Sequence, residues 1–207
     1  MFASAHSSLI IIVAETIAAL LSFALCLAAV RMRFGLNEVV GRSNHKVPTP
    51  RTGGLMALIA LFGASALLGA TGLIDREVAL LLGVTALAGV LGVADDFLNL
   101  PAIPKLLGQI VIACTLTFLL GPEQELPLPF LGWIELPSVV AYVLTILWIV
   151  GIMNVINFMD GLNGLVGSVT LLVLLAAGFL APNAQALLMV TCAAIVGFLA
   201  VNVFWGR

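Results

Sequence analysis

The segment VALLLGVTALAGVLGVADD, residues 78 to 96, is a long apolar run that ends in two adjacent aspartates. Such a run is typical of a helix that crosses a lipid bilayer, which takes about 20 apolar residues. Asp95 and Asp96 are not expected to be buried in apolar surroundings like the residues before them. An unpaired buried carboxylate is costly, and two neighbouring carboxylates repel each other. We therefore expect the pair at the membrane surface, within reach of water, a metal ion or a cationic ligand.

The composition of the whole chain also indicates a membrane protein. Of the 207 residues, 62% are hydrophobic and 9% are charged, and the mean hydropathy is +1.24. A soluble domain carries roughly 25% charged residues, so the expected environment is the lipid bilayer. The formal net charge of −2 speaks against a nucleic-acid partner, which requires a dense basic patch.

Seven apolar segments are long enough, or nearly so, to span a bilayer as helices. Helices are expected because each backbone group must be satisfied within its own segment. The predicted fold is an all-α, polytopic transmembrane helix bundle, with spans near residues 8–30, 53–72, 77–94, 104–121, 137–156, 163–181 and 184–204.

The basic residues predict the orientation of this bundle, because cytoplasmic loops carry an excess of Lys and Arg. Arg76 falls on one side, and seven basic residues fall on the other: Arg31, Arg33, Arg42, Lys46, Arg51, Lys105 and Arg207. We therefore expect the N-terminus outside and the C-terminus in the cytoplasm.

Three polar segments fall on the predicted cytoplasmic face. The first, GRSNHKVPTPRTGG at residues 41–54, is basic and stiffened by prolines, and it leads into the second span. A stiff basic loop that meets a helix N-terminus suits an anion such as phosphate, and Lys46 is the expected contact. The alternative is a loop that serves only as a positive-inside anchor.

The second segment is the Asp95–Asp96 pair, followed ten residues later by Lys105. Helix capping would explain one of the acids, but it does not explain two at a membrane boundary. Lys105 has an alternative reading as an interfacial lysine whose stem lies along apolar surface.

The third segment, NVINFMDGLNG at residues 154–164, carries four polar side chains at steps of three. Its glycines predict a break in the helix, which is tolerated at membrane depth where the chain lines a cavity. A polar contact between helices would explain the first of the four but not the acid. The polar residues are Asn154, Asn157, Asp160 and Asn163.

Carboxylate and amide oxygens without a His or Cys cage favour a hard cation, Mg²⁺ or Mn²⁺. Lysines beside such a site suggest phosphate. Together these features predict phosphoryl transfer, in which a metal ion bridges phosphate oxygens.

Three motifs, HKVPTPRTGG, GVADDFLNLPAIPKLLGQ and NVINFMDGLNGLVG, resemble those of the polyprenyl-phosphate N-acetylhexosaminyl-1-phosphate transferases, in the same order. That family includes initiating enzymes of O-antigen synthesis and the muramoyl-pentapeptide transferase of peptidoglycan synthesis. The resemblance implies Mg²⁺-dependent transfer of a sugar-1-phosphate from a UDP-N-acetylhexosamine to undecaprenyl phosphate, with release of UMP. It also implies a bacterial inner membrane, an active site on the cytoplasmic face and a homodimer as the usual assembly.

The resemblance also implies roles for residues of this sequence. Asp95, Asp96 and Asp160 match catalytic acids of the family, although the sequence does not divide the work between the first two. Lys46 and Lys105 match positions that contact phosphates. Asn157 matches a position near Mg²⁺ and the diphosphate, and Asn163 matches a contact to the uracil ring.

One departure and one alternative remain. The family continues after the seventh span with a Gly-Asp motif that carries a principal magnesium ligand, whereas this sequence ends at VNVFWGR. We therefore expect residues 1–207 to form a single membrane domain, the N-terminal part of a longer transferase, and to be inactive alone. The alternative function is an ion-coupled membrane transporter with broken helices.

Overall fold

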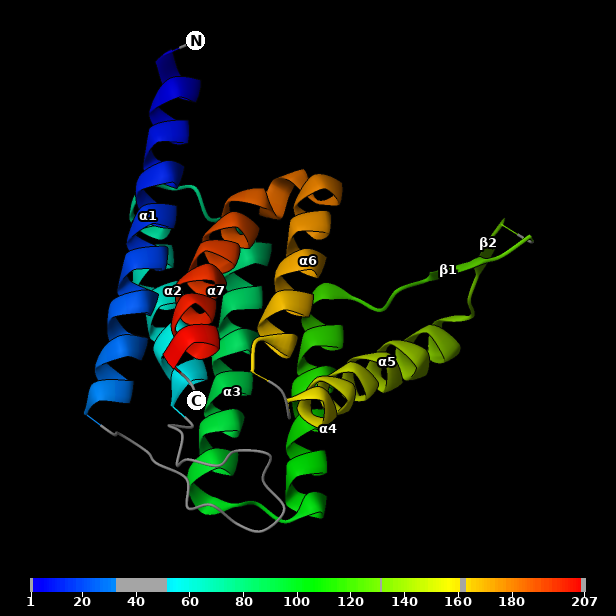
Figure 1. The fold of residues 1–207 in the computed structure, drawn as a ribbon. Coiled ribbons are helices and arrows are strands. Elements are labelled where there is room, and N and C mark those ends of the chain that lie inside the picture. The colour runs from blue at the N-terminus through cyan, green and yellow to red at the C-terminus, as the bar shows by residue number, and fades with distance from the viewer. Residues whose placement is uncertain (1, 33–51, 131, 161–162, 206–207) are drawn as a thin grey trace. The chain divides into compact units, whose positions relative to one another are not determined.

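The computed structural model describes residues 2–32, 52–130, 132–160 and 163–205 (Figure 1). In chain order its elements are α1 (Phe2–Arg31), α2 (Gly53–Ala70), α3 (Arg76–Leu98), α4 (Ala102–Leu120), β1 (Glu125–Leu128), β2 (Gly132–Glu135), α5 (Ser138–Met159), α6 (Leu165–Leu180), a short 3₁₀ turn η1 (Pro182–Ala184) and α7 (Gln185–Trp205). The predicted all-α membrane bundle is confirmed, with a small β-hairpin that the sequence reading did not foresee.

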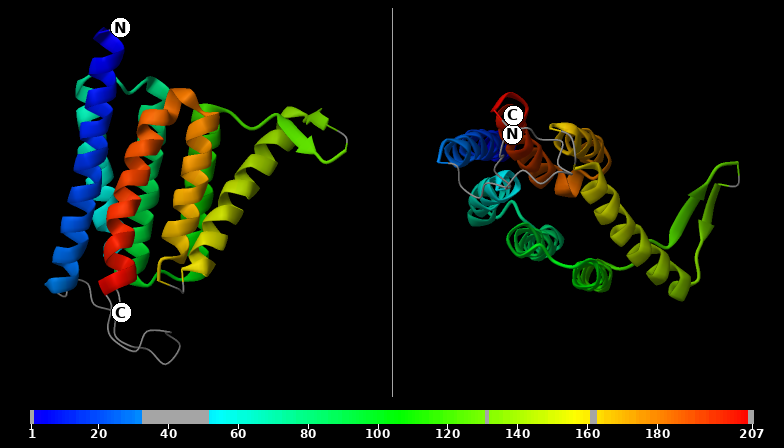
Figure 2. Two further views of the ribbon diagram at one scale, coloured as in Figure 1. Left: turned by 45° about the horizontal axis from the view of Figure 1, so that its top comes forward. Right: turned by 60° about the horizontal axis from the view of Figure 1, so that its bottom comes forward.

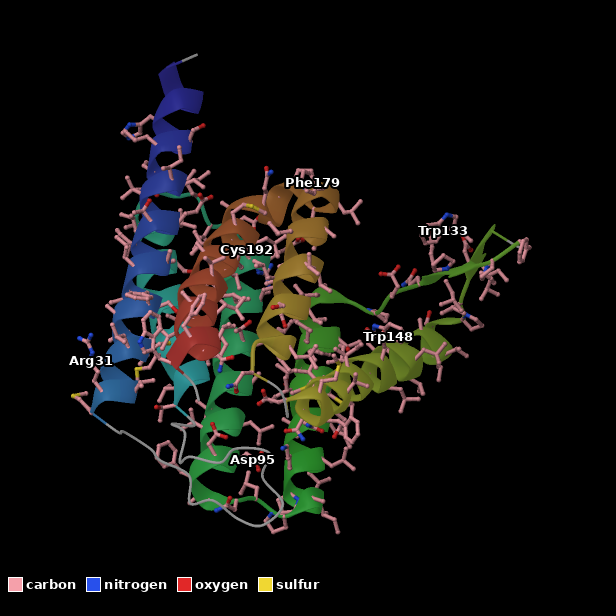
Figure 3. All side chains as sticks on the ribbon, in the orientation of Figure 1. Arg31, Asp95, Trp133, Trp148, Phe179 and Cys192 are labelled. Atoms are coloured by element: carbon pink, nitrogen blue, oxygen red, sulfur yellow. The ribbon has the colours of Figure 1, made fainter. Side chains whose placement is uncertain are left out.

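Six helices of the described ranges are long and apolar enough to cross a membrane, and α6, at 16 residues, is shorter. Large apolar side chains are exposed, among them Trp148 and Phe179, which are labelled in Figure 3 and are 73% and 83% exposed. Such exposure suits contact with lipid, where apolar surface needs no protein cover.

The helix boundaries differ from the sequence prediction at the aspartate pair. The third span was expected to end at residue 94, but α3 continues through Asp95 and Asp96 to Leu98. The Asp95 carbonyl still accepts a hydrogen bond from the N–H of Asn99, at 2.9 Å. Asn99 then adopts a left-handed conformation, with φ of 48°, which ends the helix. Both acids therefore lie in the last turn of α3.

The chain divides into two compact units, residues 1–78 with 159–207 and residues 79–158. In the first unit α1, α2 and α7 pack side by side, and α6 packs on α7 (Figures 1 and 2). The buried face of α1 carries a small residue at every fourth position: Ala14, Ala18, Ser22 and Cys26. Small residues let membrane helices approach closely.

Gly197 of α7 shows how close this approach is. A Cβ atom added there would collide with the carbonyl oxygen of Ala19 and would lie 2.9 Å from the backbone nitrogen of Phe23. The neighbouring atoms belong to the backbone of α1 and cannot move aside. Only glycine fits at this crossing of α1 and α7.

The last turns of α7 also contact the first turns of α2 and α6. Cβ atoms added to Gly53 and Gly167 would lie 2.8 Å and 3.4 Å from opposite edges of the Phe198 ring. Within the first unit, one aromatic ring thus packs against the beginnings of α2 and α6. These two helices follow the first and third polar segments of the sequence.

The second unit contains nearly all of α3, together with α4, the hairpin and α5. The Leu91 side chain of α3 reaches toward Gly108 of α4: a Cβ added at Gly108 would lie 2.8 Å from a methyl carbon of Leu91. The hairpin pairs Glu125 with Glu135 and Leu128 with Gly132 in an antiparallel register. It joins α4 to α5.

Candidate active site

A cluster of polar side chains from three helices gathers in the second unit. The ammonium of Lys105, in the first turns of α4, donates to Asp95 Oδ2 at 2.5 Å and to Asn157 Oδ1 at 2.8 Å. Asp95 lies near the C-terminal end of α3 (Figure 3), and Asn157 lies near the C-terminal end of α5. Residues 62 positions apart in sequence therefore share one lysine, and we name these three residues the Lys105 cluster.

The Lys105 cluster is partly open to its surroundings. The side chains of Lys105 and Asp95 are 21% and 26% exposed, and both Asn157 and the neighbouring Asp96 are exposed. An ion pair at this exposure adds little to stability. The arrangement instead leaves a fixed positive charge and two oxygen-bearing groups within reach of a ligand.

The packing of α3 on α4 explains why Lys105 meets Asp95. Leu91 lies one turn before Asp95 on α3, and Gly108 lies one turn after Lys105 on α4. The contact between Leu91 and Gly108 therefore belongs to the same helix faces as the ion pair. A side chain at residue 108 would meet the end of the flexible Leu91 side chain, which would have to shift next to the charged pair.

A second polar contact lies one turn away, and its buried member, Gln109, was not singled out in the sequence. Asn154 Nδ2 donates to Gln109 Oε1 and to the carbonyl oxygen of Val150, both at 2.8 Å. Gln109 is only 3% exposed. Its signal in the sequence is a lone amide inside an apolar helix, four residues after Lys105. The prediction that Asn154 makes a polar contact between helices agrees with this bond.

The other predicted residues are distributed differently. Asp160 and Asn163 belong to the first unit, where both are exposed. Lys46 and the rest of the loop at 33–51 lie outside the described residues. The convergence of the three polar segments on one site therefore stays a prediction.

The predicted helix break is present between α5, which ends at Met159, and α6, which begins at Leu165. Gly164 precedes α6 with φ of 80°, a left-handed conformation that glycine adopts without strain. Its N–H donates to Oδ1 of Asn202 on α7, at 2.6 Å. Asn202 therefore fixes the residue next to Asn163, a contact that the sequence reading missed. Its signal was a lone amide near the end of the last apolar run.

The donor set of the second unit suits a hard cation. Asp95 and Asp96 carry carboxylate oxygens and Asn157 carries an amide oxygen, the kinds of ligand that Mg²⁺ prefers. Among the described residues, no group of three or more His, Cys, Asp or Glu side chains gathers around one point. Mg²⁺ is commonly held by one or two carboxylates together with substrate phosphates, so this sparse set fits a metal that binds with its substrate.

A known protein family matches this chain over the region that contains the Lys105 cluster. A sequence model described as "Glycosyl transferase family 4" matches residues 78–206, which is more than half of the chain. The chain belongs to glycosyl transferase family 4. The match includes the Lys105 cluster, Gln109, Asp160, Asn163 and Asn202.

The chain is also similar to a phospho-N-acetylmuramoyl-pentapeptide-transferase of Halalkalibacterium halodurans. The two are 33% identical over 138 residues, a region that covers 55% of this chain and 42% of the relative. The chain thus matches less than half the length of that relative. The family predicted from the motifs is confirmed.

Proposed function

We propose that this protein transfers an N-acetylhexosamine-1-phosphate from a UDP-sugar to undecaprenyl phosphate at the cytoplasmic face of a bacterial inner membrane. The product is a lipid-linked diphosphate sugar that begins a cell-envelope glycan of the O-antigen type. The Lys105 cluster carries this proposal, because it joins a carboxylate, an ammonium and an amide oxygen at the end of three membrane helices. The family and the pentapeptide-transferase relative support it.

The reaction is a displacement at phosphorus. An oxygen of the lipid phosphate attacks the phosphorus that carries the sugar, and a new P–O–P bond forms. The bond between this phosphorus and the bridging oxygen breaks, and UMP leaves with that oxygen. Because the attacking and leaving groups are both anionic, the protein contributes mainly by positioning them and by stabilising negative charge.

Lys105 is suited to the charge-stabilising part of this work. Its ammonium is held by Asp95 and Asn157, so a phosphate oxygen that approaches meets an oriented donor. Preorganised donors of this kind need no rearrangement when charge develops. Asp95 holds the lysine in place, and the adjacent Asp96 is exposed at the end of the same helix. Either acid can orient the lipid phosphate or accept its proton.

The metal is part of the proposal. Asn157 and the carboxylates of Asp95 and Asp96 would hold Mg²⁺, or Mn²⁺, together with phosphate oxygens of the substrates. An ion held there would neutralise negative charge on the phosphate oxygens of the substrates. Asp160, Asn163 and Lys46 are proposed to complete the site as an acid, a uracil contact and a phosphate contact.

The proposal is tested by release of UMP and formation of labelled lipid from undecaprenyl phosphate, with UDP-GlcNAc and UDP-GalNAc as donors. The native protein, purified from its own membrane, is expected to be active with Mg²⁺ and inactive in EDTA, whereas residues 1–207 alone are expected to be inactive. Lys105→Met should lower the rate by roughly 100-fold, the usual scale for loss of one charge-stabilising donor. Thr115→Val is the matched control, because the hydroxyl of this half-buried residue of α4 donates to the Val111 carbonyl oxygen of its own helix.

Two results would overturn the proposal: no UMP release with either donor, or a rate that Lys105→Met leaves unchanged. Substrate uptake by sealed vesicles without UMP release would support the transporter instead.

A further inference from the structure

Gln109 and Asn154 form the second of two polar contacts between α4 and α5. The first contact joins Lys105 to Asn157, and the second joins Gln109 to Asn154. Lys105 and Gln109 are four residues apart on α4, and Asn154 and Asn157 are three residues apart on α5. These spacings place each pair of residues on one face of its helix. The same relative position of the two helices therefore satisfies both contacts.

Little else in the described residues fixes α5 along its length. Ala141 is the one buried residue among its described positions, and it lies far from the cluster, at the other end of the helix. The ribbons of α4 and α5 lie near each other at the C-terminal end of α5 and diverge toward the hairpin (Figures 1 and 2). Apolar packing at the cluster end is therefore sparse, and polar contacts decide where α5 lies against α4.

The contact between Gln109 and Asn154 is the more constrained of the two. Gln109 is nearly fully buried. If a buried amide loses its partner, its desolvation is no longer offset by a hydrogen bond, and the folded state is destabilised. Asn154 is itself fixed by its second N–H, which donates to the carbonyl oxygen of Val150 in the same helix. The backbone of α5 is thus connected through Asn154 to the interior face of α4.

We infer that Gln109 and Asn154 are positioning residues: they set the register of α5 on α4 that brings Asn157 to Lys105. A shift of α5 by one residue would move it about 1.5 Å and would separate both contacts at once. The effect on catalysis rests on the proposed function, whereas the effect on Lys105 does not.

The reactivity of Lys105 tests the inference without any assay of activity. This sequence contains two lysines, Lys46 and Lys105, so acetylation by an N-hydroxysuccinimide ester can be followed by mass spectrometry with Lys46 as the internal reference. Gln109→Leu should make Lys105 react roughly tenfold faster relative to Lys46, because the amine reacts only when it leaves its partners. Asn154→Ala, which alters the exposed member of the pair, should act in the same direction.

Two further variants of α4 make the test specific. Gln109→Glu keeps an oxygen that Asn154 can donate to, and should restore slow labelling. Thr117→Val removes a second buried polar group of the same helix, 1% exposed and bonded to its own Ala113 carbonyl, and should leave labelling unchanged. In the transferase assay, Gln109→Leu should lower kcat by roughly ten- to 100-fold and leave KM for the UDP-sugar unchanged, since a small misplacement of catalytic groups has this effect.

The outcomes separate the two proposals. Equal labelling of Lys105 in the wild type and in Gln109→Leu and Asn154→Ala overturns the positioning role, as does faster labelling in Thr117→Val. Faster labelling in Gln109→Leu and Asn154→Ala, with no UMP released by the wild type, leaves the positioning role standing and removes the transferase.

Discussion

The two units of this protein hold their helices together by different means. In the first unit, α1 and α7 meet where Gly197 lies against the backbone of α1, and the buried face of α1 is lined with small residues. In the second unit, α4 meets α3 and α5 through Lys105 and Gln109, which bond to side chains of those helices. The first kind of contact depends on the absence of a side chain, and the second depends on particular polar atoms.

The two kinds of helix contact should respond differently to substitution. Close backbone packing cannot accept added volume, because interiors are already dense and rigid. A partly exposed polar cluster can lose a charge at small cost in stability, because the groups that remain can be solvated. Substitutions in the first unit should therefore act on folding, and substitutions in the Lys105 cluster should act on chemistry.

The largest expected effect is that of Gly197→Leu. The new side chain would be forced into the backbone of α1, and we expect a loss of at least about 3 kcal/mol in stability, the upper part of the range for overpacking. The measurement is the yield of monodisperse protein in detergent and its unfolding temperature. Gly83→Ala is the matched control, because an added Cβ at Gly83 of α3 meets no atom within 4 Å. A stable, monodisperse Gly197→Leu protein would contradict the packing described for α1 and α7.

The next effect is on activity rather than on stability. Asp95→Asn removes the charge that faces Lys105 and should lower kcat on the order of 10²-fold or more, if Asp95 is an acid of the proposed reaction. Its effect on the free energy of unfolding should stay below about 1 kcal/mol, because the ion pair is partly exposed. Activity and thermal unfolding are measured on the same preparation. Unfolding of this variant together with its loss of activity would show that the cluster is structural.

A smaller effect is expected at Asn202, which makes a polar contact within the first unit. Asn202→Ala leaves the N–H of Gly164 without its acceptor and should cost about 1 kcal/mol. Asn202→Asp keeps the acceptor oxygen and should restore stability, as measured by thermal unfolding. Under the proposed function, the alanine variant should also raise KM for the UDP-sugar, because Asn163 is next to Gly164. Equal stability of the alanine and aspartate variants would rule out this role for Asn202.

The sequence predicted the apolar elements well, because the period and length of apolar runs are local properties. It placed the end of α3 too early, since the apolar run stops at residue 94 whereas the hydrogen bonding of the helix continues to Asn99. The hairpin was missed because Glu125–Leu128 and Gly132–Glu135 are short and rich in residues that also suit loops.

The candidate site could be predicted only in part. Charged side chains such as Asp95 and Lys105 stand out in an apolar sequence. Gln109 and Asn202 did not, because a single amide in a membrane helix has no meaning until its partner is known. The distance between residues 109 and 154 is set by the packing of two helices, which no local pattern encodes.

The smallest expected effect lies at the far end of the second unit, where α4 leads into the hairpin. The N–H of Glu123 donates to the hydroxyl of Thr145 on α5, at 3.0 Å, and the contact is exposed. Thr145→Val removes the acceptor at similar volume, and water can replace it, so the cost to overall stability should be a few tenths of a kcal/mol. Hydrogen exchange at Glu123 should nevertheless become faster, whereas exchange in the helical turns around Lys105 should not change. Thr115→Val, which removes an exposed hydroxyl bonded within α4, should leave both regions as they are. If Thr145→Val also speeds exchange in the turns around Lys105, the hairpin end of α5 contributes to the register of α5 on α4. That register would then not depend on Gln109 and Asn154 alone.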